Sequence, residues 1–259
     1  ELWTKYVTAC VDRYKGRITH WEMLNEPNCQ LTPEQYVTYL KATYAAVRKA
    51  DQDAKLVGLC VTGDLNGDIL TFMRDCFKLG ALDGCDVVSF HPYSARLDWS
   101  APFTAESMTA QVKALMNEFG GEGKELWNTE LFYIGKNTPD DNYFQHLIKG
   151  HELPRRCLID LATGVSKSFC LPDDYLLKVT LAPNYWHNSA QMACAPIPSR
   201  LFVISNTLAK LFGNAKFVRQ VPLLGKNKLY VFAKEGSPIA ATWSFDDEDK
   251  PSLLRLPRA

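Results

Sequence analysis

Short apolar runs alternate regularly with longer amphipathic segments over residues 2–171, and this pattern limits the folds that the chain can adopt. The short runs are almost continuously apolar, as expected for strands buried on both faces of a parallel sheet. The longer segments repeat apolar residues every three or four positions, as helices do. This alternation favours consecutive βαβ units. We expect helices at 2–14, 33–47, 67–79, 105–119 and 152–163, and strands at 17–24, 55–61, 86–90, 125–129 and 166–171.

The pattern changes after residue 171. A proline-containing stretch leads to an expected helix over 199–212, and no helix is expected after it. Short β-rich runs separated by turn residues favour a small antiparallel module. We therefore expect a partial (β/α)8 barrel over 1–213, with five of the eight strands present, and a C-terminal β-strand module, complete or not, over 214–259. The β-rich runs are 216–221, 228–233 and 239–245.

Composition excludes several classes of protein. With 259 residues, 46% of them hydrophobic, the chain can bury a large core. Its 29 basic and 29 acidic residues cancel, so we expect neither a nucleic-acid nor a membrane partner. No apolar run approaches the roughly 20 residues of a membrane-spanning helix. The eight cysteines form no CxxC pair or Cys/His cluster, which favours buried free thiols over a disulfide framework and predicts no metal site.

Two glutamates are placed where a barrel enzyme builds its active site. Glu26 follows the expected strand 17–24, and Glu130 follows the expected strand 125–129. Active sites of parallel α/β barrels lie at the carboxyl ends of the strands, and a pair of carboxylates is the minimum equipment for cleaving a glycosidic bond. The interval between them accommodates three βα units, so we expect the two carboxylates to face each other across the barrel mouth.

Other interpretations stay open for each carboxylate. Glu26 or Glu130 alone could be a solvated strand-end carboxylate or a helix N-cap partner. Glu22 competes with Glu26 but lies roughly 13 Å further down an extended strand, and Glu125 opens its strand at the opposite end. We therefore expect Glu22 to be structural and Glu125 to lie far from the chemistry.

Aromatic side chains in loops are the second ingredient of a sugar site, because sugar rings stack on them. The candidates are Trp99, Tyr133 and Trp186, all outside the expected strands. Loop aromatics also serve as packing lids, so this alternative stays open. Trp21 and Trp127 lie inside expected strands and are more simply explained as core residues.

The run Trp-Glu-Met-Leu-Asn-Glu-Pro-Asn at 21–28 resembles a motif of a known clan: retaining glycoside hydrolases built on a (β/α)8 barrel, whose fourth strand ends in Asn-Glu-Pro and whose seventh ends in a nucleophilic Glu. Within the clan it looks most similar to the β-xylosidase and α-L-iduronidase type family. The His-Pro-Tyr sequence at 91–93 also matches the clan pattern.

The resemblance implies roles for individual residues. It implies that Glu26 is the acid/base and Glu130 the nucleophile, and that Asn25 bonds the sugar 2-hydroxyl. Tyr93 would hold the nucleophile ionised, and His91 would bond the sugar or the acid/base. No cofactor or metal is expected, and the expected ligand is a carbohydrate.

The chain departs from the clan pattern in two ways. The resemblance implies that it starts in the third helix and that about strands 4–8 of the barrel are present. The chain is thus N-terminally incomplete against the family, and we expect an upstream segment of the same protein to supply the missing strands. The eighth strand also ends in Phe-Cys-Leu-Pro-Asp-Asp at 169–174, where relatives commonly place an aromatic platform; Trp186 could substitute.

Three functions follow as hypotheses. The first is a retaining O-glycoside hydrolase that cleaves a poly-, oligo- or aryl-saccharide through a covalent glycosyl-enzyme. The second is a non-catalytic carbohydrate-binding protein with a degenerate barrel, and the third is a transglycosylase that shares the covalent intermediate. A secreted or periplasmic location is favoured, and a cytoplasmic one stays open.

Overall fold

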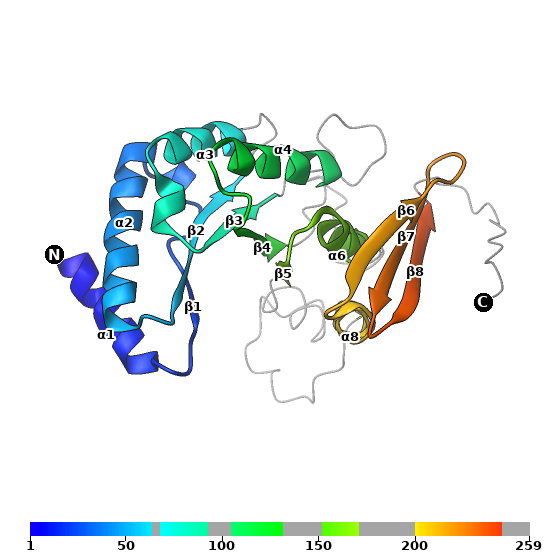
Figure 1. Ribbon diagram of the computed structural model, residues 1–259, viewed down its shortest axis with the longest axis horizontal. Helices are drawn as coiled ribbons and strands as arrows, with labels where there is room; N and C mark the ends of the chain where they lie inside the picture. The colour runs from blue at the N-terminus through cyan, green and yellow to red at the C-terminus, as the bar shows by residue number, and fades with distance from the viewer. Residues whose placement is uncertain (64–67, 93–104, 132–151, 171–199, 245–259) are drawn as a thin grey trace, which may run out of the picture.

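Five parallel strands form a curled sheet in the order β1-β2-β3-β4-β5 (Figure 1). The computed structural model describes the chain except residues 64–67, 93–104, 132–151, 171–199 and 245–259. Spatial order equals sequence order, as in a barrel wound by repeated βα units. The strands are β1 (His20–Glu22), β2 (Lys55–Thr62), β3 (Val87–His91), β4 (Glu125–Leu131) and β5 (Lys167–Cys170).

Helices cover one face of this sheet (Figure 1). Residues such as Leu40, Met73 and Ile159 from three of these helices pack in one core with sheet residues that include Leu56 and Val88. The expected capping box begins the second helix: the Thr32 hydroxyl accepts from the Gln35 amide, and the Gln35 side chain accepts from the Thr32 amide. The helices are α1 (Leu2–Tyr14), α2 (Pro33–Ala50), α3 (Asp68–Lys78), α4 (Ala105–Glu118) and α6 (Glu152–Thr163), and two short 3-10 helices are η1 (Pro27–Cys29) and η2 (Ala81–Gly84).

The opposite face of the sheet is the concave face. Val57, Val87 and Trp127 form a separate small cluster, while their chain neighbours Leu56 and Val88 belong to the core under the helices. The two clusters therefore lie on opposite faces, because neighbouring strand residues alternate between faces. Trp127 is buried, as expected for a strand tryptophan.

Strand β1 is shorter than the expected strand 17–24. The Arg17 and Ile18 amides both bond the Tyr14 carbonyl, so the chain is still turning out of α1 at these residues. Leu24 has a left-handed φ of 57°, which ends regular extension before the Asn-Glu-Pro run. The strand thus ends at Glu22, yet the Met23 amide continues the pairing by donating to the Val57 carbonyl.

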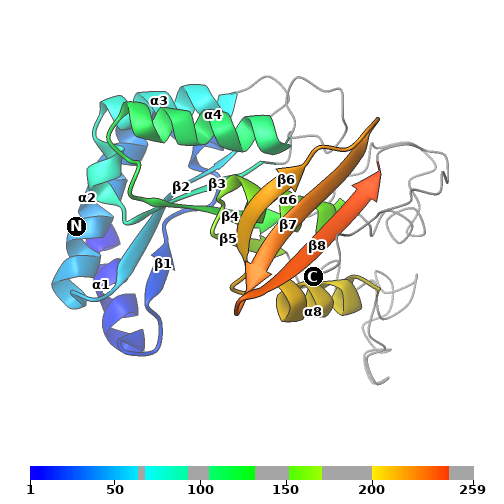
Figure 2. The ribbon, with the colours of Figure 1, turned by 45° about the vertical axis from the view of Figure 1, so that its right-hand side comes forward.

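The C-terminal strands β6 (Lys216–Val221), β7 (Asn227–Lys234) and β8 (Ser237–Ser244) form a three-stranded antiparallel sheet after α8 (Arg200–Phe212). Figure 2 shows this sheet beside α6 and α8. Tyr230 and Phe232 are buried and belong to the same core as the barrel helices. The Arg155 guanidinium also donates to the Ser244 carbonyl at 2.9 Å. The division at residue 213 stays a prediction.

None of the helices in the described part of the chain is long and apolar enough to cross a membrane.

Candidate active site

The backbone of Glu26 is hydrogen-bonded to β2. It has left-handed dihedrals, φ 48° and ψ 55°, directly before η1, and its amide donates to the Cys60 carbonyl at 3.1 Å. Asn28 bonds Thr62 twice: its amide nitrogen donates to the Thr62 carbonyl at 2.9 Å, and its oxygen accepts from the Thr62 amide at 3.1 Å. Glu26 therefore reaches the carboxyl end of the sheet by way of a fixed turn rather than a continuous strand.

Glu130 lies inside β4, one residue from its end, where the prediction placed it just after the strand. The pairing between β4 and β5 shifts register between Asn128 and Leu131, so the backbone around Glu130 is irregular. Its side chain is 22% exposed, close to the 26% of Glu26. Both carboxylates are half-buried and remain accessible to a ligand.

His91 lies between the two carboxylates at the end of β3. Its Nδ1 is 3.0 Å from Glu26 Oε1 and 3.8 Å from Glu130 Oε2, and the residue is only 1% exposed. One ligand atom from each of the three residues lies within 4.8 Å of the others. The structure thus brings together three residues that are 39 to 104 positions apart in the sequence.

The second ring nitrogen of His91 has partners of its own. Nε2 is 3.3 Å from Cys60 Sγ and 3.1 Å from Thr129 Oγ1. Both ring nitrogens therefore have partners, and these contacts fix the orientation of the imidazole between residues of β2 and β4. Fixing a histidine from both sides sets which nitrogen carries the proton.

Of the other predicted site residues, the structure describes Asn25 alone. Asn25 is exposed beside Glu26. Four predicted substrate contacts lie outside the described residues, so their roles stay predictions: Tyr93, Trp99, Tyr133 and Trp186.

The two rejected glutamates have structural partners. Glu22 Oε1 accepts from the Ser89 hydroxyl at 2.7 Å. Glu125 accepts from the Trp127 indole at 2.7 Å and from the Ser166 hydroxyl at 2.8 Å. The indole hydrogen bond is the main cause that lowers the Glu125 pKa, since it stabilises the carboxylate. Glu125 takes no part in the contacts around His91, whereas Glu22 lies near the Cys60 thiol, which contacts His91.

Residues missed by sequence reasoning are Cys60, Thr129 and Ser89. Cys60 was interpreted only as a buried free thiol, and it is free and buried. Burial is the main cause that raises the pKa of its thiol to about 12, and the nearby Glu22 charge adds to it. The one sequence signal for Cys60 was its position near the end of an expected strand. Its contact with His91 could not be predicted, because it depends on a local irregularity of the backbone.

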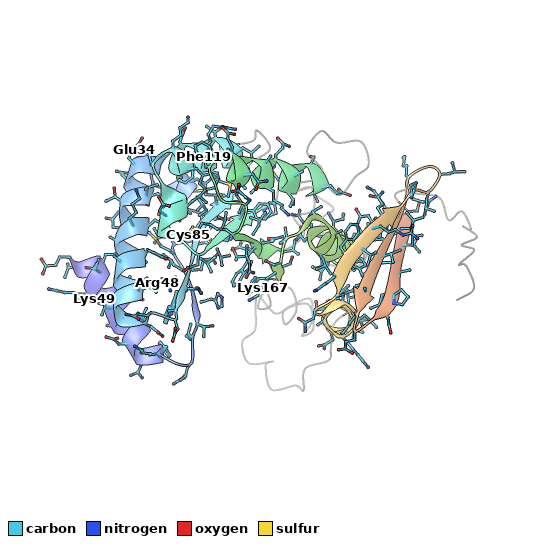
Figure 3. All side chains as sticks on the ribbon, viewed as in Figure 1. Glu34, Arg48, Lys49, Cys85, Phe119 and Lys167 are labelled. Atoms are coloured by element: carbon cyan, nitrogen blue, oxygen red, sulfur yellow. The ribbon has the colours of Figure 1, made fainter. Side chains whose placement is uncertain are left out.

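An aromatic and cationic group lines the concave face below the carboxylates. The Trp127 ring lies 5.1 Å from the His20 ring and 5.7 Å from the Phe169 ring, between centroids. The Lys167 ammonium lies 4.1 Å from the Trp127 centroid, a cation–π distance, and Figure 3 labels Lys167 on β5. Phe169 is 45% exposed, and the group lies toward the amino ends of the strands, where the Trp127 indole bonds Glu125 and where β1 and β5 begin.

Glu26, His91 and Glu130 are the one group of three potential metal ligands within the described residues. The same side chains are those that acid–base chemistry requires, and the expectation of no metal or cofactor stays a prediction.

The chain was compared with known protein families, with curated proteins and with solved structures. No family model matches the chain, and no curated protein matches it. A family 39 glycoside hydrolase from Bacteroides cellulosilyticus superposes with a TM-score of 0.70 at 20% identity, over 94% of this chain and 51% of that one. The chain has the fold of a (β/α)8-barrel protein. The predicted partial barrel, followed by an antiparallel β-sheet, is confirmed.

Two further solved structures agree. A monomeric β-xylosidase from Caulobacter crescentus matches with a TM-score of 0.57 at 16% identity, over 96% of this chain and 52% of that one. A family 44 xyloglucanase from Paenibacillus polymyxa matches with a TM-score of 0.55 at 11% identity, over 93% and 57%. The chain spans about half the length of these structures. All three are glycoside hydrolases by name, which supports the resemblance at the level of the fold.

Proposed function

We propose that the protein is a retaining O-glycoside hydrolase. The observation that carries the proposal is the short gap between Glu26 and Glu130, whose oxygens come within 4.8 Å of each other beside His91. Retaining enzymes hold their two carboxyl groups roughly 5–5.5 Å apart, whereas inverting enzymes leave roughly 6.5–9.5 Å for a water molecule. A gap under 5 Å favours direct attack by one carboxylate on the sugar.

In the first step Glu130 attacks the anomeric carbon while Glu26 gives its proton to the leaving oxygen. The bond from the anomeric carbon to the leaving oxygen breaks, and a covalent glycosyl-enzyme forms. In the second step Glu26, now a carboxylate, takes a proton from water, and the water oxygen displaces Glu130. Atoms and protons balance without a cofactor.

His91 supports this division of roles. Its Nδ1 is nearer to Glu26 than to Glu130, so its hydrogen bond orients the acid/base first. Thr129 and Cys60 prevent the ring from turning away. A protein that only bound carbohydrate would have no use for two half-buried carboxylates held at this spacing, so the catalytic alternative is preferred over the binding one.

The substrate class follows from the fold and the motif rather than from the described residues. Structural neighbours include a β-xylosidase and a xyloglucanase, and the Asn-Glu-Pro run resembles that of β-xylosidases. We therefore propose a poly-, oligo- or aryl-saccharide substrate, with aryl xylosides as the first to assay.

The testing experiment is hydrolysis of a panel of aryl glycosides and plant polysaccharides by the full-length protein. Proton NMR of the first-formed sugar should show the anomer of the substrate, because two displacements retain configuration. An inverted first product, or no turnover on the whole panel, would contradict the proposal. Added acceptor sugars that become glycosylated would show that a sugar can replace water in the second step.

A further inference from the structure

A β-bulge in β2 controls what faces the active site. Pairing between β2 and β3 shifts register between Gly58 and Val61, and Leu59 and Cys60 both have left-handed φ values, 78° and 46°. Left-handed backbone is costly for residues other than glycine, on the order of 1–3 kcal/mol each. Two consecutive residues in this region are therefore maintained by the surrounding structure.

The bulge reverses the alternation of side chains. Val57 faces the concave side, and Leu59 and Val61 both belong to the core under the helices. In an uninterrupted strand, residues 57, 59 and 61 would share one face. Because the bulge adds one residue, Cys60 points to the concave side, where its sulfur meets His91.

Side chains from two other elements hold the bulge in place. The Leu59 amide donates to the Tyr36 hydroxyl at 2.6 Å, and the Cys60 amide donates to Ser89 Oγ at 3.1 Å. The Cys60 carbonyl accepts from the Glu26 amide. One residue thus bonds the backbone of the acid/base through its carbonyl and the histidine beside the acid/base through its sulfur.

We propose that Cys60 is a positioning residue for the acid/base: its S–H donates to His91 Nε2, which places the imidazole proton on Nδ1 for donation to Glu26 Oε1. This inference rests on the proposed function. A thiol carries its proton at neutral pH, and burial, which raises the pKa of Cys60 to about 12, keeps that proton in place at alkaline pH as well.

The tautomer matters for the chemistry. With the proton on Nδ1, Glu26 Oε1 is occupied as an acceptor, and the acidic proton of Glu26 stays on the other oxygen for the leaving group. With the proton on Nε2, that nitrogen would donate to Thr129, and Nδ1 would accept the Glu26 proton in competition with the leaving oxygen. Cys60 selects the productive arrangement.

The test compares Cys60→Ala with Cys60→Ser and with Cys76→Ala in the full-length protein. Cys76 is also a buried free cysteine, on α3, so its replacement removes a similar side chain away from the site. A misplaced acid/base lowers the cleavage rate most for substrates with poor leaving groups, because these depend most on protonation. We expect Cys60→Ala to lose roughly fivefold to tenfold more kcat/KM on a poorly leaving aryl glycoside than on a dinitrophenyl glycoside, the size of one hydrogen bond. Cys60→Ser, which keeps a donor, should recover most of this ratio, and Cys76→Ala should leave it unchanged.

Imidazole ¹⁵N NMR gives a readout that needs no activity. The wild-type His91 ring should show its proton on Nδ1, and Cys60→Ala should move the proton population toward Nε2. If Cys60→Ala changes neither the leaving-group ratio nor the tautomer while Thr129→Val changes both, the positioning role belongs to Thr129 and the proposal is wrong. A wild-type protein without glycosidase activity would refute the proposed function, and the NMR result would still decide whether Cys60 sets the tautomer.

Discussion

The side chain of Asn28 bonds the backbone of Thr62 as a neighbouring strand would. Its amide nitrogen and oxygen bond the carbonyl and amide of the same residue at 2.9 and 3.1 Å. This pair of bonds connects the turn that carries Glu26 to the end of β2, beyond the point where β1 has ended. Glu26 is therefore positioned by a side chain that mimics backbone pairing.

Replacing Asn28 should separate catalysis from folding. Asn28→Ala removes both bonds and leaves part-buried backbone groups of Thr62 without partners, at a cost of about 1–3 kcal/mol in the free energy of unfolding. We expect kcat to fall as the Glu26 turn loosens, which steady-state kinetics below the unfolding temperature would measure. Gln111→Ala, which removes one exposed side-chain bond on α4, is the control and should change neither quantity.

The two glutamates should give different kinetic signatures. Glu26→Ala should retain activity on substrates with good leaving groups, because these need no acid, and external azide should restore turnover by acting in place of water. Glu130→Ala should lose activity on every substrate, because no covalent intermediate can form. Kinetics on a series of aryl glycosides measures the difference. Glu118→Ala removes an exposed carboxylate on α4 and serves as the control; equal losses for Glu26→Ala and Glu130→Ala on all substrates would contradict the assigned roles.

Removing the Tyr36 hydroxyl should destabilise the β2 bulge. Tyr36→Phe leaves the buried Leu59 amide without an acceptor, so we expect the free energy of unfolding to fall by about 1–3 kcal/mol, measured by urea denaturation. Tyr39→Phe is the matched control, since Tyr39 lies on the same helix and is 45% exposed. The explanation is wrong if both variants lose the same stability.

A methyl group at Gly58 should be poorly tolerated. A Cβ there would lie 2.8 Å from Cys85 Cβ and 3.1 Å from Leu40 Cδ1, both in the core under the helices. We expect Gly58→Ala to cost about 1–3 kcal/mol through overpacking, seen as a lower midpoint of thermal unfolding. At Gly123 a Cβ would meet nothing within 4 Å, so Gly123→Ala should leave the midpoint almost unchanged.

The junction between α4 and the C-terminal sheet should respond to pH. Burial tends to raise the Glu106 pKa, but its own backbone amide and the Lys228 and Tyr230 side chains outweigh burial, so the pKa is lowered from its usual 4.5. The folded state therefore binds this proton less readily than the unfolded state, and the stabilisation is present above the unfolded pKa and lost as pH falls through the folded one.

Comparison of wild type with Glu106→Gln checks whether the stabilisation by Glu106 is lost at low pH. The variant should be less stable by about 1 kcal/mol at pH 7, and the difference should shrink as pH falls below 4.5. Urea denaturation at several pH values measures it. Glu118→Gln, which alters a surface pair with Arg74, should show almost no difference at any pH. A difference for Glu106→Gln that grew toward low pH would contradict the lowered pKa.

Much of the architecture could be predicted because its causes are local. Apolar runs and amphipathic periods indicated all five barrel strands, and Thr32, Pro33 and Gln35 predicted the start of α2 correctly. Glu26 and Glu130 were predicted to face each other because parallel strands bring their carboxyl ends to one edge, and the resemblance added His91 beside them. The strand bounds near Glu26 were wrong, because the turns at Arg17 and Leu24 depend on helix ends and left-handed backbone.

The alternation of strands and helices follows from the amino-acid sequence alone, and so does the edge of the sheet at which the two carboxylates meet. Hydrophobic periodicity is sufficient for this, since burial dictates which face of each element turns inward. The atomic contacts within the site depend on the three-dimensional packing of distant segments. The bulge at Leu59 and Cys60 exists because Tyr36, Ser89 and Glu26, distant in the sequence, bond its backbone, and it turns an ordinary buried cysteine toward His91.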